Sequence, residues 1–147
     1  MTPTPGEHRG ELATILKSWQ MAETATIERA TEVIEHTGHP VIRLAMEIVL
    51  RDSEMHRRVQ QAILDGPERQ AFTAEELREI WKLVEQQSEA EERRLEFARQ
   101  AASACRTNVE QLPLTYLLLT YVVEDEKKRA RLLGCLENFQ HNRYEDV

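Results

Sequence analysis

Two glutamates of this chain lie where the apolar side of a helix should continue. Glu23 lies on the same helical face as Leu16, and Glu91 lies on the same face as Val84. Burying a charge costs several kcal/mol unless it is paired or bound to a metal. The sequence therefore predicts partners for both acids inside the fold.

Two other segments each carry a pair of polar residues at the same distance after a valine. Ser53 and His56 follow Val49 by four and seven residues, and Glu126 and Arg129 follow an equivalent valine by the same steps. Residues three apart share one face of a helix, so a carboxylate and an imidazole at that spacing can hold one ion. Hard or borderline divalent cations suit such donors.

The elements that must position these side chains are predicted to be helices. Hydrophobic residues make up 41% of the 147-residue chain and charged residues 31%, with only 5 Gly and 5 Pro. Apolar residues recur at helical spacing, and Thr73 with Glu76 forms a capping-box pattern. We expect one all-α domain over 1–147, with helices at about 7–36, 40–64, 74–106 and 113–140.

The two halves of the chain align as a repeat. A shift of 68 superposes Glu23 on Glu91, and a shift of 73 superposes Pro40 on Pro113 and His56 on Arg129. Two unrelated amphipathic helices would align their leucines by chance, but not their prolines and acids as well. The sequence predicts two related helical hairpins.

Composition argues against several classes of partner. The net charge of -7 and the pI of about 5.3 disfavour binding to nucleic acid or anionic lipid. No apolar run reaches the roughly 20 residues of a membrane span, and no signal peptide is visible. Cys105 and Cys135 fall near opposite ends of a predicted hairpin, too far apart to bridge. A reducing cytoplasm is the expected location.

The polar pattern resembles the ferritin-like superfamily, which includes bacterioferritin and rubrerythrin. That fold is a four-helix bundle with one Glu on helices 1 and 3 and a Glu-x-x-His on helices 2 and 4. Here the segment SEMH ends at His56 and the segment EKKR ends at Arg129. Both lie within short motifs similar to DSEKH and DEKKH of rubrerythrin-related proteins. The resemblance implies metal ligands at Glu23, His56, Glu91 and Glu126, with Ser53 and Arg129 replacing the other two.

The resemblance implies a degenerate site that binds one Fe, Mn or Zn ion or none, and not a competent di-iron oxidase. In the metal-free reading, Arg129 occupies the place of one ion and clamps Glu91 or Glu126. Two alternatives stay open at this point. One is a rubrerythrin-like di-iron oxidase or peroxidase, and the other is a helical protein–protein interaction module without chemistry.

The length of the connection between the second and third predicted helices bears on the oligomeric state. A ferritin-like bundle needs a crossover along the length of helix 2, which is about 36 Å. The connection from Asp65 to Thr73 spans at most about 30 Å when fully extended. We therefore expect a homodimer, in which the hairpins can be swapped between chains. A simple up-down-up-down bundle is the alternative.

Overall fold

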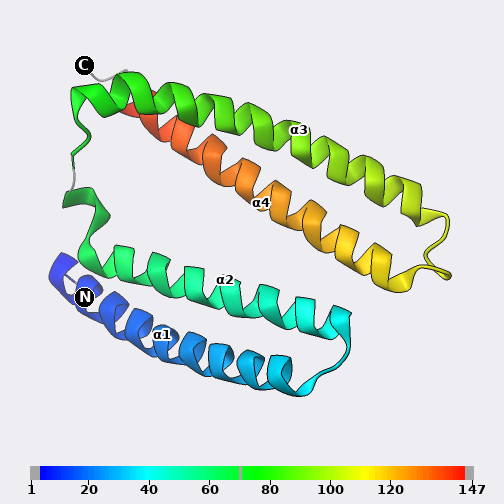
Figure 1. Cartoon of the computed structure of the whole chain (residues 1–147). Helices are drawn as coiled ribbons and strands as arrows, with labels where there is room; N and C mark the ends of the chain where they lie inside the picture. The colour runs from blue at the N-terminus through cyan, green and yellow to red at the C-terminus, as the bar shows by residue number, and fades with distance from the viewer. Residues whose placement is uncertain (1–3, 70, 145–147) are drawn as a thin grey trace. The chain divides into compact units, whose positions relative to one another are not determined.

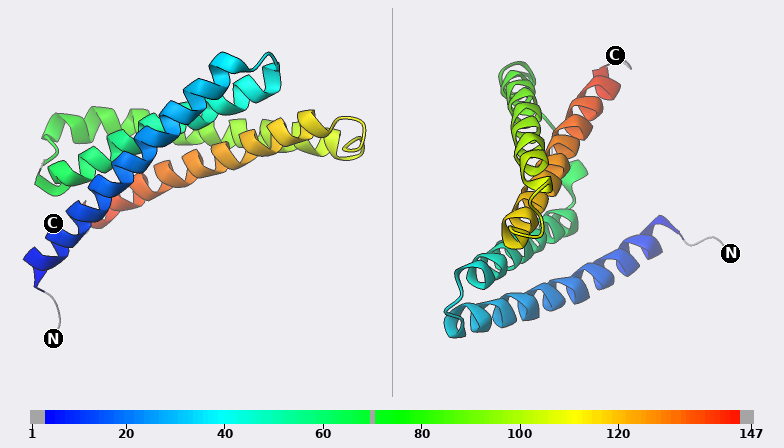
Figure 2. Two further views of the ribbon diagram at one scale, coloured as in Figure 1. Left: turned by 90° about the horizontal axis from the view of Figure 1, so that it is seen from below. Right: turned by 90° about the vertical axis from the view of Figure 1, so that its right-hand side faces the viewer.

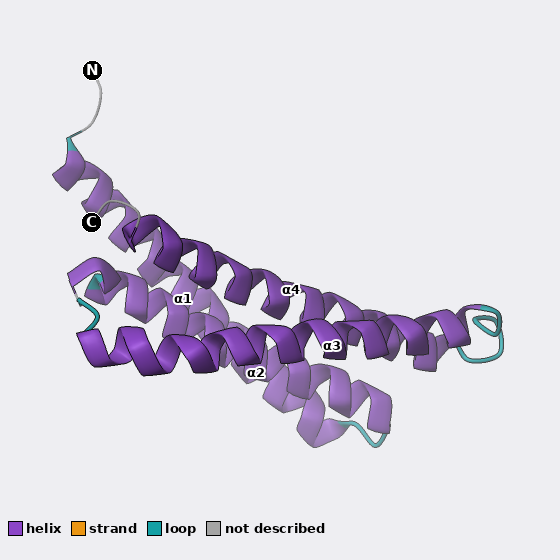
Figure 3. Cartoon of the chain, turned by 90° about the horizontal axis from the view of Figure 1, so that it is seen from above, coloured by secondary structure: helices purple, strands orange, loops and turns teal. Residues whose placement is uncertain are grey.

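The computed structural model describes residues 4–69 and 71–144. The described residues form four long helices, with two short helical turns between the second and the third and no strand (Figures 1 and 3). Their bounds are α1 Pro5–His36, α2 Pro40–Asp65, η1 Pro67–Arg69, η2 Glu76–Ile80, α3 Trp81–Arg106 and α4 Pro113–Tyr144. The predicted all-α class is therefore confirmed, and each predicted helix has its counterpart.

Local signals explain where the helices begin. Thr4 caps α1 in a capping box with Glu7, whose Oε2 accepts a hydrogen bond of 2.7 Å from the Thr4 backbone N–H. Proline occupies the first helical position of α1 and α2, where its missing N–H costs nothing. Gly66 ends α2 in the left-handed conformation, at φ 78°, which suits glycine.

The start of the third helical segment is capped as the sequence predicts. The Glu76 carboxylate accepts from the Thr73 N–H at 2.8 Å, and the Glu76 N–H donates to Thr73 Oγ1 at 3.2 Å. The π-helical turn η2 then leads into α3. That turn is absent from the sequence prediction, because apolar spacing does not separate one π turn from an α-helix.

The helices form two compact units, and the boundary between them in the sequence lies between Ala71 and Phe72. In the first hairpin α1 packs along α2, and in the second hairpin α3 packs along α4 (Figure 2). The predicted hairpins are present, and their closure into one four-helix bundle stays a prediction.

Burial inside the hairpins follows the predicted repeat. The buried residues of α1 are Leu16, Glu23 and Ala30, at steps of seven. A shift of 68 takes the last two to Glu91 and Ala98, which are buried on α3. Both hairpins thus have a narrow seam with an acid at mid-length.

The hairpins also leave equivalent apolar positions exposed. Five exposed residues of the first hairpin correspond, through the shifts of 68 and 73, to five exposed residues of the second. We call them the repeated apolar face: Leu12 and Ile80, Leu44 and Leu117, Val49 and Val122, Val59 and Leu132, Ile63 and Leu136. Exposed apolar side chains that recur at equivalent positions of both hairpins make these residues a candidate interaction surface.

Two further expectations are met. Cys105, buried, and Cys135, exposed, are both free thiols, as their predicted separation requires. No helix in the described part of the chain is long and apolar enough to cross a membrane.

Candidate functional site

The first hairpin joins a buried acid on α1 to a histidine on α2. His56 Nδ1 lies 3.0 Å from Glu23 Oε1, across a separation of 33 residues. The Glu23 side chain is 10% exposed, whereas that of His56 is 53% exposed. The inward position predicted for Glu23 is confirmed. His56 contacts the acid at the seam, with half of its side chain outside the seam.

Ser53 is part of the same contact. It is buried on α2, and its hydroxyl donates a hydrogen bond that is the largest cause lowering the pKa of Glu23. Burial opposes this by raising the pKa, and His56 lowers it further through a hydrogen bond and its charge. Glu23 is therefore held as a carboxylate by two polar neighbours from α2.

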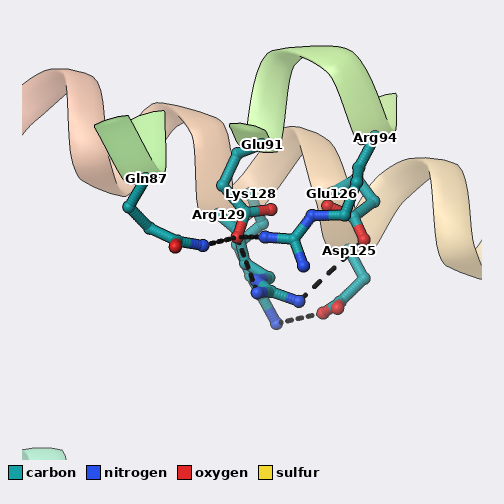
Figure 4. Close-up of polar contacts among 7 residues, drawn as sticks. All are labelled: Gln87, Glu91, Arg94, Asp125, Glu126, Lys128 and Arg129. Atoms are coloured by element: carbon teal, nitrogen blue, oxygen red, sulfur yellow. Dashed lines mark hydrogen bonds and ion pairs between the residues drawn. The ribbon is translucent and has the colours of Figure 1, made fainter. Parts of the chain in front are cut away.

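The second hairpin gathers three donors on one buried acid. Glu91 is 1% exposed, and its Oε1 accepts from Gln87 Nε2 at 2.9 Å, from Arg129 at 2.6 Å and from Arg94 (Figure 4). Gln87 and Arg94 lie one turn away on α3, whereas Arg129 reaches across from α4. Charge-assisted hydrogen bonds of this kind compensate for the burial of a carboxylate.

Glu91 and Glu126 each change the pKa of the other. Burial raises the pKa of Glu91, but the hydrogen bond from Glu126, that from Gln87 and the charges of both arginines together lower it. The hydrogen bond to Glu91, then burial and the Glu91 charge, raise the pKa of Glu126. Glu126 therefore holds its proton to a higher pH than an ordinary glutamate, and in its protonated form its O–H group can donate a hydrogen bond to the Glu91 carboxylate.

This pairing accounts for two buried oxygens. Glu91 Oε2 and Glu126 Oε2 are buried and have no hydrogen-bond partner among the described residues. A protonated Glu126 would supply one donor there, because a carboxylic acid has one O–H group. A proton shared between the two acids would thus satisfy these oxygens, which two full negative charges would not.

Arg129 bridges the two acids and does not clamp one of them. One guanidinium nitrogen lies 2.6 Å from Glu91 Oε1, and the other lies 3.9 Å from Glu126 Oε1. The predicted ion pair with Glu91 is confirmed, although its geometry is not bidentate. Asp125 contacts Lys128 at 3.0 Å, to one side of this cluster (Figure 4).

The predicted site residues fall into two sets. The first hairpin joins Glu23, Ser53 and His56, and the second joins Glu91, Glu126 and Arg129. Among the residues that the structure describes, no group of three or more His, Cys, Asp or Glu side chains could hold a metal ion. Metal binding by these residues stays a prediction.

The sequence reasoning missed several neighbours of the two acids. Gln87 and Arg94 lie four residues before and three residues after Glu91, a spacing that places them on its face and was visible in the sequence. Gln60 is also buried, 2% exposed on α2. Its polar character hid it from a search for apolar periodicity.

A cavity of about 520 Å³ lies at another level of the first hairpin. Residues near the start of α1 and the end of α2 line it, among them Leu12 and Ile63 of the repeated apolar face. Neither Glu23 nor His56 contributes to its walls. The cavity is therefore separate from the Glu23–His56 contact, and its walls combine apolar residues with Arg9, Glu68 and Arg69.

Comparison with known protein families, curated proteins and solved structures finds no match to this chain.

Proposed function

We propose that this chain is a ferritin-like protein whose core site has degenerated. It binds at most one divalent metal ion, at Glu23 and His56, and it is not a competent di-iron oxidase. The observation that carries the proposal is the contact of 2.6 Å between Arg129 and Glu91. A fixed positive charge stands there beside the buried acid, where a ferritin-like site would hold a cation.

The second half of the site does not fit an iron ion. Arg129 offers only donors and keeps its charge, so it cannot ligate a metal. The pKa of Glu126 is raised beside Glu91, and a carboxyl group must lose its proton to act as a strong ligand. Arg129 and Arg94 already supply positive charge beside the buried Glu91 carboxylate, so its burial does not need a metal.

The first half of the site does offer ligands. Glu23 is held as a carboxylate, and His56 supplies an imidazole 3.0 Å away. This pair suits Fe, Mn or Zn. A bound ion would supply Lewis-acid or redox chemistry there, while Ser53 and burial orient the Glu23 carboxylate. Ser53 brings a hydroxyl where the resemblance implies a third ligand.

We also propose that the repeated apolar face closes the bundle. An exposed apolar side chain gains roughly 1.5–3 kcal/mol when it is fully buried. The two hairpins expose equivalent apolar positions, so the same apolar pattern is available for burial on each of them. Closure would place both polar sets at mid-length, as in a ferritin-like core.

The proposed partner is a second copy of the chain. In a ferritin-like bundle α3 runs parallel to α2, so the connection must travel the length of α2, about 39 Å for its 26 residues. The eight residues 66–73 reach at most about 30 Å, and η1 shortens them further. Exchange of hairpins between two chains removes this conflict.

The proposal is tested by metal content after purification without chelators, measured by plasma mass spectrometry. We expect at most one Fe, Mn or Zn per chain, lost in the Glu23→Ala, His56→Ala double variant. The matched change Arg129→His should raise metal content, because it restores a ligand and removes the fixed charge. Lys128→His, one position away, is the control.

Two results would contradict the proposal. Two iron ions per wild-type chain with iron-dependent consumption of peroxide would indicate a working di-iron oxidase. An Arg129→His variant that gains no metal over Lys128→His would count against the ferritin-like arrangement itself. Chain exchange is tested separately by light scattering, in which an exclusively monomeric chain would contradict the swapped dimer.

A further inference from the structure

Gln60 is a buried amide without a hydrogen-bond partner. Its side chain is among the largest fully buried ones, and neither Nε2 nor Oε1 has a partner among the described residues. Native proteins pair the large majority of buried polar side-chain atoms, so an unpaired amide indicates a water, an ion or a group that completes it.

The position of Gln60 connects it to the Glu23–His56 pair. Gln60 follows Ser53 by seven residues and His56 by four on α2, and α2 packs against α1. Side chains four apart on a helix are neighbours, with Cβ atoms about 5–6 Å apart. The buried amide therefore lies one turn from the imidazole, on the side of α2 that carries the buried Ser53.

The repeat provides a comparison within the same chain. Through the shift of 73, Gln60 corresponds to Leu133, which is half-buried on α4, and His56 corresponds to Arg129. The hairpin with its own fixed cation thus has a leucine at this position. The hairpin without a fixed cation has an amide there, so packing of the repeat does not require the polar group.

We propose that Gln60 is a third ligand at the first half-site, where its Oε1 joins Glu23 and His56 around one divalent cation. This inference rests on the proposed function, since it assumes an ion at that pair. Amide and carboxylate oxygens favour harder ions, so a set of two oxygens and one imidazole nitrogen suits Mn²⁺. Gln60 Nε2 would then donate to water on the ion.

The experiment is a titration of the full chain with Mn²⁺, followed by the electron paramagnetic resonance signal of the free ion. We expect the wild type to bind one Mn²⁺ and Gln60→Leu to bind at least tenfold more weakly. Gln60→Glu keeps an oxygen donor and should bind at least as tightly as the wild type. Leu133→Gln, the equivalent position in the second hairpin, should leave the affinity unchanged.

Circular dichroism of each variant shows whether α-helix content is preserved. Unchanged affinity in a folded Gln60→Leu variant would overturn the role of Gln60 and leave the degenerate site in place. Absence of Mn²⁺ binding by the wild type would also overturn this inference. The proposed function would survive that result, because it also covers a site that holds no metal ion. Two Mn²⁺ per chain would instead contradict the proposed function.

Discussion

The Arg129 guanidinium on α4 lies 2.6 Å from Glu91 Oε1 on α3, although the two residues are 38 positions apart. The carboxylate is buried, whereas the Arg129 side chain is 44% exposed. This pair therefore joins the two helices of the second hairpin at a charged contact inside the seam.

Glu91→Gln should destabilise the chain by about 2 kcal/mol in urea unfolding. Loss of one partner of a buried ion pair costs about 3–5 kcal/mol, and the partial exposure of both arginines lowers that figure. Glu126→Gln is the control, because glutamine resembles a protonated Glu126 in shape. We expect it to cost under about 0.5 kcal/mol. Equal losses in both variants would refute the shared proton.

Stability should depend on pH through Glu126. Its raised pKa means that the folded chain keeps a proton that the unfolded chain releases near its ordinary pKa of 4.5. The free energy of unfolding contributed by this group therefore falls as the pH rises from 4.5 through the raised pKa. Across that pH window, the free energy of unfolding should change less with pH for Glu126→Gln than for the wild type. An unchanged slope would show that Glu126 titrates normally.

Ser53→Ala should raise the pKa of Glu23, because the Ser53 hydroxyl is the largest cause that lowers it. A lowered carboxyl pKa stabilises the fold above the unfolded pKa, and that contribution is lost as the pH falls. The variant should therefore lose stability at neutral pH. Carboxyl carbon shifts in NMR report the pKa, with Ser88→Ala on α3 as control. An unchanged pKa of Glu23 in Ser53→Ala would show that Ser53 is not part of the site.

Leu132→Ser and Val59→Ser should both weaken the association of the hairpins. They are equivalent members of the repeated apolar face, and each exposed side chain would be covered on closure. We expect about 1–2 kcal/mol lower stability for each, and a larger share of single chains in light scattering. Met21→Ser is the control, because Met21 is exposed and lies outside that face. Variants indistinguishable from Met21→Ser would argue against closure through this face.

Thr73→Ala should fray the start of the third helical segment. The variant removes the Thr73 hydroxyl that accepts from the Glu76 N–H. The hydrogen bonds to Thr73 lower the pKa of Glu76. The start of this helical segment should therefore loosen as the pH falls and Glu76 becomes protonated. Hydrogen exchange at residues 74–80 measures both effects. Thr107→Ala, beyond the end of α3, should leave that exchange unchanged.

Local sequence determined the helices of this protein. Prolines at helix starts, the capping residues Thr4 and Thr73, and Gly66 act within a few residues of themselves. Their effects can therefore be read without the rest of the chain. The repeat and the inward position of Glu23 and Glu91 likewise follow from spacing along single helices.

Only the tertiary structure decided which polar groups meet. The bond between Glu23 and His56 depends on how far α1 slides along α2, and the bridge from Arg129 to both acids depends on the same relation in the second hairpin. The unpaired amide of Gln60 arises from burial, and the raised pKa of Glu126 arises from its hydrogen bond to Glu91 and then from burial. Contact and desolvation are properties of packed helices, so helical periodicity alone does not determine them.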